Sequence, residues 1–272
     1  HTHLPENLFV KGEPETGADL ADDLERIAGN IGAENIAACI VEPVAGSTGT
    51  LVPPKGYLKR LREICDKHGI LLIFDEVITG FRIEYGGCQQ YYNIEPDLVT
   101  YGKAAGGGMP IGVVAGSKRV MNTFSGADDT PTIFAGGTFN GHPLTMAAGI
   151  AILEHLKKNQ EEIYPYLHEQ GNRIASEINE FCTSNNIPAQ MMNAGSMMHL
   201  IFSGEEIQSS RDISHSLYKV EKEFYLHLLG HNVIVPGIHL AFISYAHKPE
   251  IVDQVIDAFK KSFEDLREDG YL

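Results

Sequence analysis

The sequence lacks a long apolar run, a leader-like beginning and an excess of basic charge. No stretch of its 272 residues approaches the roughly 20 apolar residues that a membrane-spanning helix needs. The first residues, 1–6, do not combine a basic region with an apolar segment, so they do not resemble a signal peptide. The 21 basic and 36 acidic residues give a formal charge of −15, whereas a nucleic-acid-binding protein needs a basic surface. We therefore expect neither a membrane nor a nucleic acid as a partner.

Cysteine is also scarce, and its spacing suggests no disulfide framework. The four cysteines, Cys39, Cys65, Cys88 and Cys182, form no C-x-x-C pair. A reducing, cytoplasmic location is the simplest interpretation of this pattern. Hydrophobic residues make up 43% of the chain and charged residues 21%, which excludes a disordered or collagen-like protein.

Several common nucleotide-binding and hydrolytic motifs are absent. Gly102-Lys103 does not belong to a P-loop, because Asp97 replaces its first glycine and Ala104 replaces its Ser or Thr. The triple glycine 106–108 lacks the third glycine of a dinucleotide-binding fingerprint, since Ile111 stands there. No serine lies in a G-x-S-x-G nucleophile elbow.

The sequence likewise offers no convincing metal site. His227 and His231 are four residues apart on an expected helix, but Leu228 stands where a zinc protease has glutamate. A metal needs more ligands than two helical histidines supply, so surface or packing roles are favoured. We therefore expect no bound metal.

Short apolar segments alternate with amphipathic ones over the first part of the chain. The segment 70–74 is apolar on both faces, as in a parallel strand covered by helices. This alternation is typical of an α/β fold. The expected strands are 36–41, 70–74, 98–101 and 111–115, and the expected helices are 18–28 and 53–69.

From Pro143 onward, longer helices predominate. The segment 143–156 is apolar nearly all round, which predicts a buried helix. We therefore expect two domains, a larger one over 1–157 and a smaller α+β domain over 158–272. The other expected helices are 163–182, 213–229 and 249–266, and the expected strands are 197–202, 233–235 and 241–244.

Two strand ends carry the chemistry. Asp75 and Glu76 follow one buried strand, and Lys103 follows another, just before the glycines 106–108. Taken alone, each would be interpreted as a solvated carboxylate or a surface lysine. Together they suit pyridoxal phosphate, because a lysine kept partly neutral by burial can form a Schiff base. A carboxylate can then hold the pyridine nitrogen protonated, which makes the ring an electron sink.

At these residues the sequence resembles the class III aminotransferases, pyridoxal-phosphate enzymes of fold type I. The resemblance is strong over about residues 11–158 and weaker beyond. It implies a mainly parallel sheet sandwiched by helices, with a smaller C-terminal domain. The motifs that carry it, in the family's order, are 42–46, 51–61, 73–82, 101–110 and 136–144, with 244–247 in the weaker part.

The resemblance also implies roles for four residues. Lys103 would be the Schiff-base lysine and would move the proton between substrate and cofactor. Asp75 would pair with the pyridine nitrogen, and Val77 would pack under the ring. Thr138 would bind the cofactor phosphate of the partner subunit in a homodimer with shared active sites. Without the resemblance, Thr138 would be interpreted as part of a local hydroxyl-capped turn.

The family includes more than one activity. The segment 11–61 is most similar to transaminases that move an amino group between an amine or ω-amino acid and a keto acid. Residues 80–82 and 86–92 are more similar to glutamate-1-semialdehyde aminomutase. We expect an aminotransferase; the alternatives are such an aminomutase or an inactive truncated homologue.

One part of the family's cofactor site has no counterpart here. Its phosphate-binding loop and ring-stacking aromatic residue lie upstream of the region matched by residue 11. The loop 45–50 is the one Gly/Ser/Thr-rich candidate, and its family counterpart does not bind phosphate. We therefore expect the 272-residue chain to bind pyridoxal phosphate weakly or not at all by itself, to be longer at the N-terminus in its natural form, and to expose a large apolar patch.

Overall fold

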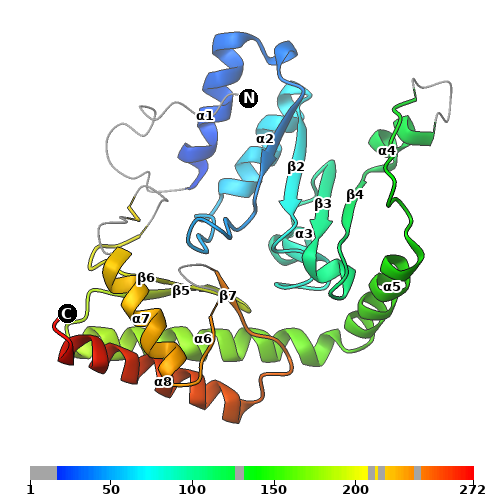
Figure 1. Cartoon of the computed structure of the whole chain (residues 1–272). Helices are drawn as coiled ribbons and strands as arrows, with labels where there is room; N and C mark the ends of the chain where they lie inside the picture. Colours follow the sequence, from blue (N-terminus) through cyan, green and yellow to red (C-terminus); the bar gives the residue numbers. More distant parts are fainter. Residues whose placement is uncertain (1–16, 126–131, 208–211, 214–217, 236–239) are drawn as a thin grey trace.

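The computed structural model describes residues 17–125, 132–207, 212–213, 218–235 and 240–272 (Figure 1). A four-stranded sheet has the order β1-β2-β3-β4. Strands β1 to β3 run parallel, and β4 pairs antiparallel with β3. The mainly parallel α/β sheet expected from the sequence is thereby confirmed. The bounds are Ala38–Val41 for β1, Leu71–Glu76 for β2, Leu98–Gly102 for β3 and Gly112–Gly116 for β4.

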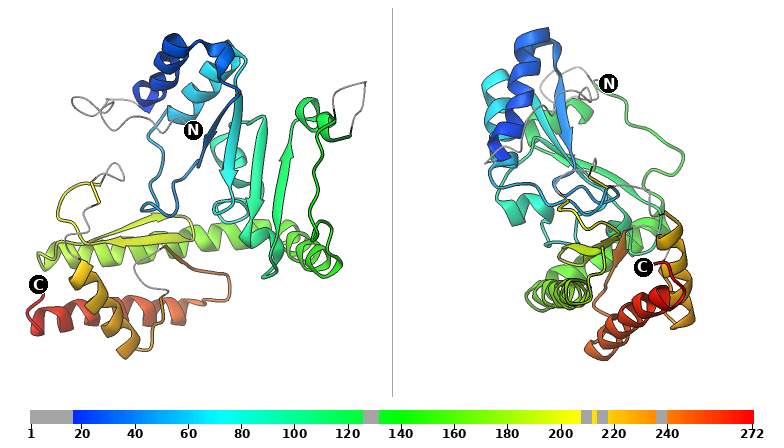
Figure 2. Two further views of the ribbon diagram at one scale, coloured as in Figure 1. Left: turned by 45° about the horizontal axis from the view of Figure 1, so that its top comes forward. Right: turned by 90° about the vertical axis from the view of Figure 1, so that its left-hand side faces the viewer.

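Helices α1 (Gly17–Ile31) and α2 (Tyr57–His68) lie side by side on one face of this sheet (Figure 2). Ile64 of α2 packs in the same buried cluster as Leu72 and Phe74 of β2. As the sequence predicts, α2 ends at a glycine: Gly69 has φ 70°, a left-handed conformation that glycine adopts without steric cost.

The opposite face of the sheet is open within the described residues. Ile40 of β1 is 63% exposed and Val114 of β4 is 51% exposed. On the intervening β2, Ile73 and Asp75 point the same way and are only half-buried. An apolar surface of the kind expected from the sequence therefore lies beside the strand end that carries Asp75.

The C-terminal part builds a second, antiparallel sheet of order β5-β6-β7. Helices α6, α7 and α8 pack against it (Figure 2), and Phe224 and Phe263 meet in their shared core with ring centroids 4.6 Å apart. The bounds are Gln160–Ser184 for α6, Gln190–Ala194 for β5, Met197–Ile201 for β6, Tyr218–Gly230 for α7, Ala241–Phe242 for β7 and Pro249–Glu268 for α8.

Some elements differ from those expected. Val233–Val235 is not a strand, and the expected helix 213–229 begins at Tyr218, residues 214–217 lying outside the described ones. Strand β5 and the short helices α3 (Gly87–Tyr92) and α4 (Lys118–Ser125) were not expected. The division into domains after residue 157 stays a prediction.

Helix α5 (Pro143–Lys158) forms as expected but is not buried. Leu144 is 59% exposed and Ile150 is 58% exposed, whereas Thr145 and Gly149 are buried. The prediction of a buried helix was wrong because α5 packs through one narrow face, and the rest of its apolar surface has no cover in the described part of the chain.

Candidate active site

The parallel strands β2 and β3 end at the same edge of the sheet (Figure 1). Their register pairs Asp75 with Thr100 and Glu76 with Tyr101. Lys103 follows directly after β3, which ends at Gly102. The topology thus brings the two strand ends singled out in the sequence together, and the carboxyl edge of such a sheet is where α/β proteins bind ligands.

One oxygen of Asp75 is held and the other is available. Oδ1 accepts hydrogen bonds from the Thr100 hydroxyl and from the Val77 backbone N–H, both at 3.1 Å. Within the described residues, no hydrogen bond or ion pair involves Oδ2. The carboxylate is therefore fixed in orientation while it keeps a free acceptor. No pattern in the sequence marks Thr100, although its place next to Asp75 follows once the register is known.

Val77 packs against the residue that precedes the lysine. A Cβ atom on Gly102 would lie 3.2 Å from Val77 Cγ1 and 3.3 Å from the carbonyl oxygen of Ile111. A side chain at position 102 would therefore require one of these neighbours to shift by a few tenths of an ångström. Val77 therefore lies beside Gly102, the residue that leads into Lys103.

Lys103 begins the 3₁₀ turn η3 (Lys103–Gly106) with φ 45°, in the left-handed region. Such a conformation is uncommon for a side-chain-bearing residue and is found preferentially at functional sites. The side chain is exposed, so the burial expected of this lysine is not met within the described residues. The open face of the sheet explains this exposure.

The glycines after Lys103 have a packing role that the sequence analysis missed. Gly107 has φ 58°, and a Cβ atom there would lie 2.9 Å from the carbonyl oxygen of Ala148 on α5. Conversely, a Cβ atom added to Gly149 would lie 3.1 Å from the carbonyl oxygen of Ala105. The glycine turn thus brings the backbone of η3 close to that of α5.

Glu76 is a second carboxylate whose function differs from that of Asp75. It is fully buried and accepts hydrogen bonds from the Thr79 hydroxyl (3.0 Å) and from the backbone N–H groups of Cys88 (2.7 Å) and Gln89 (3.3 Å). Desolvation raises its pKa despite these bonds. Glu76 therefore fastens the segment 77–89 to the end of β2.

Tyr101, which pairs with Glu76 in the register of β2 and β3, contacts the segment 77–89 that Glu76 fastens. Gln89 Nε2 donates to its hydroxyl at 2.6 Å, and the Phe81 ring lies 5.0 Å from its ring. Burial raises the pKa of Tyr101 to about 12, so the phenol stays neutral over the physiological range. Its backbone therefore offers Gly102 and Lys103 a rigid support.

Thr138 lies apart from these residues. It is exposed in a turn closed by the Asn140 N–H, which donates to the Gly137 carbonyl at 3.0 Å. No hydrogen bond joins it to Asp75 or Lys103 among the described residues. Its role stays a prediction.

The described ranges show neither a metal-binding cluster nor a membrane-spanning helix. No cluster of three or more His, Cys, Asp and Glu side chains in them could hold a metal. None of their helices is both long and apolar enough to cross a bilayer.

The known proteins that this chain resembles are aminomutases and aminotransferases. The chain is 39% identical to glutamate-1-semialdehyde 2,1-aminomutase of Hyperthermus butylicus, over 94% of this chain and 61% of that protein. An ω-transaminase from Sphaerobacter thermophilus superposes with a TM-score of 0.82 at 30% identity, covering 91% of this chain and 56% of that one. A β-phenylalanine aminotransferase from Variovorax paradoxus gives a TM-score of 0.81 at 27% identity, covering 93% and 56%.

The chain thus spans between half and two thirds of the length of these relatives. The family model for class III aminotransferases matches residues 1–266, almost the whole sequence. The chain therefore belongs to the class III aminotransferase family.

Proposed function

We propose that this protein transfers amino groups with the help of pyridoxal phosphate. The observation that carries the proposal is the placement of Asp75 and Lys103 at the carboxyl ends of two neighbouring parallel strands, β2 and β3. An oriented carboxylate with a free oxygen next to a lysine in a left-handed turn is a donor set suited to this cofactor.

The residues fit the ring end of the cofactor. Asp75 Oδ2 is free to accept from a protonated pyridine nitrogen, and Val77, placed beside Gly102, offers an aliphatic surface for the ring. A dianionic phosphate needs several donors, commonly backbone amides at a helix N-terminus. We assign one of these donors to Thr138 of the partner subunit.

Bound pyridoxal phosphate supplies an electron sink for the bonds at the substrate carbon. Lys103 would bind it through its amine and carry the proton that leaves and returns to the substrate carbon. Asp75 would keep the ring nitrogen charged, since a nearby carboxylate favours the protonated form. Thr100 and the Val77 N–H would hold that carboxylate in place.

Two reactions suit this arrangement. An aminotransferase passes the amino group of an amine or amino acid to a separate keto acid, as the solved structural relatives do by name. An aminomutase returns it to the same carbon skeleton. The 39% identity to glutamate-1-semialdehyde 2,1-aminomutase favours this second candidate.

Product analysis distinguishes the two. Purified protein with added pyridoxal phosphate is given an amine donor and pyruvate in one reaction and glutamate-1-semialdehyde alone in another. Alanine in the first reaction identifies an aminotransferase, whereas an isomerised amino acid in the second identifies an aminomutase. The Lys103→Ala variant is the control, and wild-type protein that binds the cofactor yet is inactive in both reactions would contradict the proposal.

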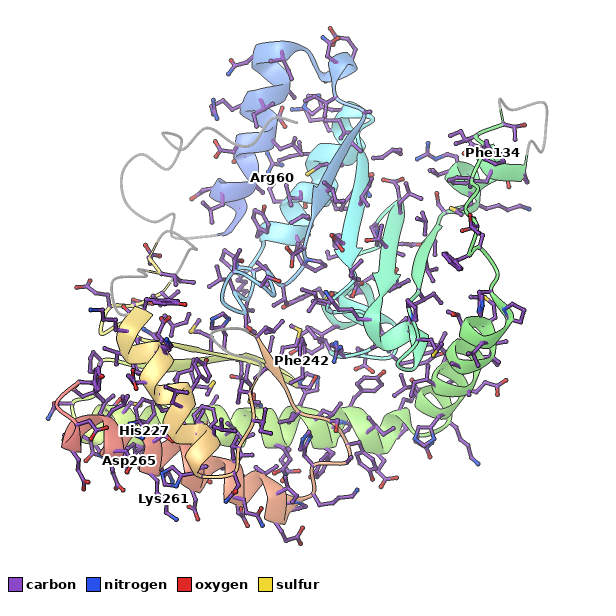
Figure 3. The ribbon with its side chains drawn as sticks, in the orientation of Figure 1. Arg60, Phe134, His227, Phe242, Lys261 and Asp265 are labelled. Carbon is purple, nitrogen blue, oxygen red and sulfur yellow. The ribbon has the colours of Figure 1, made fainter. Side chains whose placement is uncertain are left out.

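We further propose that the active form is a homodimer. The exposed apolar residues of α5 lie next to the turn that carries Thr138, and Phe134 and Phe139 in the same region are 92% and 79% exposed. Figure 3 shows Phe134 at the outer edge of the molecule, beside α4. A two-fold contact through this surface would place each Thr138 near a second copy.

A further inference from the structure

The turn before α5 carries the one asparagine of the sequence that is followed by glycine. Both residues of this pair, Asn140 and Gly141, are exposed. Figure 1 shows the segment that connects α4 to α5 running along the outer edge of the molecule. Thr138 lies in the same turn, two residues before Asn140. A change of charge at Asn140 would therefore occur beside the residue to which we assign a phosphate contact.

The backbone N–H of Gly141 has no acceptor among the described residues, whereas its neighbours in the turn are engaged. The Asn140 N–H donates to the Gly137 carbonyl at 3.0 Å, and the His142 N–H donates to the Phe139 carbonyl at 3.2 Å. No such bond involves the N–H of Gly141 in the described part of the chain. A peptide N–H of this kind is hydrogen-bonded to water, so a base in solution can remove its proton.

The Asn140 carboxamide is also unshielded. Its Oδ1 lies 3.0 Å from the position that a Cβ atom on Gly137 would occupy, but that residue has no side chain. Around Gly141 no atom lies within 4 Å of the corresponding position, its chain neighbours excepted. Gly141 has φ 67°, a conformation that glycine adopts without steric cost. The Asn140 side-chain carbon is therefore accessible to the nitrogen that follows it in the chain.

We propose that Asn140 is a site of spontaneous deamidation. The Gly141 nitrogen gives its proton to hydroxide and attacks the Asn140 side-chain carbon, which closes a five-membered succinimide ring. The bond from this carbon to the side-chain nitrogen breaks, and ammonia leaves with a proton taken from water. Water then opens the ring at either carbonyl and yields aspartate or isoaspartate. The ring closes readily because the reacting groups already lie next to each other in one chain.

The sequence contains one Asp-Gly pair, which could form the same ring, but its glycine nitrogen is engaged. Asp269 and Gly270 follow α8, and the Gly270 N–H donates to the Arg267 carbonyl at 3.1 Å. The Asp269 carboxylate lies 3.2 Å from His227 Nε2. The structure therefore favours reaction at Asn140 over reaction at Asp269.

Deamidation would introduce a carboxylate near the phosphate that Thr138 is assigned to bind. This consequence rests on the proposed function, whereas the modification itself does not. Two like charges repel each other, so the modified chain should bind pyridoxal phosphate less tightly. The isoaspartate form also lengthens the backbone between Thr138 and α5 by one methylene group. Because the amide is not restored, the modification would accumulate as the protein ages.

Peptide mapping by mass spectrometry tests the modification without requiring turnover. The whole chain is incubated in mildly alkaline buffer, and aspartate and isoaspartate at position 140 are quantified over time. We expect conversion to be at least about 10-fold slower in Gly141→Ala, because a methyl group next to the attacking nitrogen hinders ring closure. Asn159, whose Nδ2 donates to the His155 carbonyl at 2.7 Å, is the internal control and should stay intact.

The proposed contact between two copies would cover this turn, so a second protein is incubated in parallel. Ile150→Glu places a charge at a 58% exposed position of α5 and should keep the copies apart. Conversion of Asn140 in this variant, with or without conversion in the wild type, supports the inference. An Asn140 that stays intact in both proteins, or that converts no faster than Asn159, would overturn it. Equal conversion in wild type and Gly141→Ala would overturn it too.

Cofactor titration separates this inference from the proposed function. Asn140→Asp reproduces the charge of the modified chain and should lower pyridoxal phosphate affinity about 10-fold, whereas the uncharged Asn140→Gln should bind like wild type. Unchanged affinity in Asn140→Asp would contradict both the effect on the cofactor and the assignment of Thr138. Deamidation of a chain that binds no pyridoxal phosphate would support the modification and contradict the proposed function.

Discussion

Asp75 and Glu76 are neighbours on β2, yet they occupy different environments because successive side chains of a strand face opposite ways. Asp75 lies on the open face and keeps one oxygen free. Glu76 lies on the covered face, and its carboxylate accepts hydrogen bonds from the following loop. The strand thus separates a carboxylate for ligand binding from a carboxylate for structure.

Replacing Asp75 by asparagine should weaken the electron sink. The amide keeps the size of the side chain but removes the charge that would stabilise a protonated ring nitrogen. We expect kcat to fall roughly 100- to 1000-fold, as when a preorganised electrostatic group is lost. Asp75→Glu keeps the charge and should retain more activity. If the Asn variant keeps the wild-type kcat, Asp75 has no role in catalysis and is an ordinary carboxylate at a strand end.

Removing the amine of Lys103 should prevent covalent retention of the cofactor. After borohydride reduction, mass spectrometry should find pyridoxyl label on wild-type Lys103 and none on Lys103→Ala. Lys103→Arg should not restore the label, because a guanidinium stays protonated and is a poor nucleophile. Lys118→Ala, which changes an exposed lysine on α4, is the control and should label like wild type.

The buried Glu76 should make stability depend on pH. Desolvation raises its pKa in the folded protein above the ordinary value of 4.5, so the folded state holds this proton more tightly than the unfolded state. The protonated Glu76 side chain therefore contributes to the free energy of unfolding below pH 4.5, and this contribution is lost as pH rises through the raised pKa.

Glu76→Gln removes this titration. In urea unfolding between about pH 4 and pH 8, the stability of wild type relative to Glu76→Gln should therefore fall with rising pH. A difference that stays constant, or grows with pH, would show that the hydrogen bonds from Thr79 and Cys88 outweigh desolvation.

At the scale of elements, the contact between η3 and α5 positions the lysine-bearing turn. Gly107 combines a left-handed backbone with a 2.9 Å approach to Ala148, so alanine there should cause both strain and a clash. We expect Gly107→Ala to lower the free energy of unfolding by at least about 1–2 kcal/mol. Gly108→Ala is the matched control, since Gly108 has φ 94° but open space around it. Equal losses of unfolding free energy in the two variants would show that α5 shifts to accommodate the added methyl group without a measurable loss of stability.

The sequence predicted the elements whose side-chain pattern is local. Strand β2 is a continuous apolar run and α2 has a helical repeat ending at Gly69, so both could be located without a structure. Strand β5 could not, because Gln190–Ala194 is rich in Met and polar residues and depends on pairing with β6. The same limit applies to the site: Asp75 and Lys103 stand at the ends of apolar strands, whereas the close approach of Gly107 to Ala148 joins η3 to α5 through a contact that no local pattern indicates.

At the scale of the whole molecule, the apolar surfaces of α5 and of the segment before it determine how copies could associate. Leu144, Ile150 and Phe139 are all more than half exposed, although apolar side chains of this size are usually buried. Clusters of this kind on a protein surface commonly mark a contact with another molecule. If that molecule is a second copy, assembly and cofactor binding should be separable by mutation.

Two variants test this separation by sedimentation velocity and cofactor titration. Ile150→Glu places a charge in the apolar surface of α5 and should shift the protein from dimer to monomer, lowering cofactor affinity as a consequence. Thr138→Ala should leave the dimer intact but weaken cofactor binding by about 1.5–3 kcal/mol, the contribution of one hydrogen bond to a charged phosphate. Ile31→Glu, at a 47% exposed isoleucine on α1, controls for the added charge and should change neither property. A wild-type monomer with the same cofactor affinity as Thr138→Ala would contradict a shared site, since the hydroxyl would then serve only its own turn.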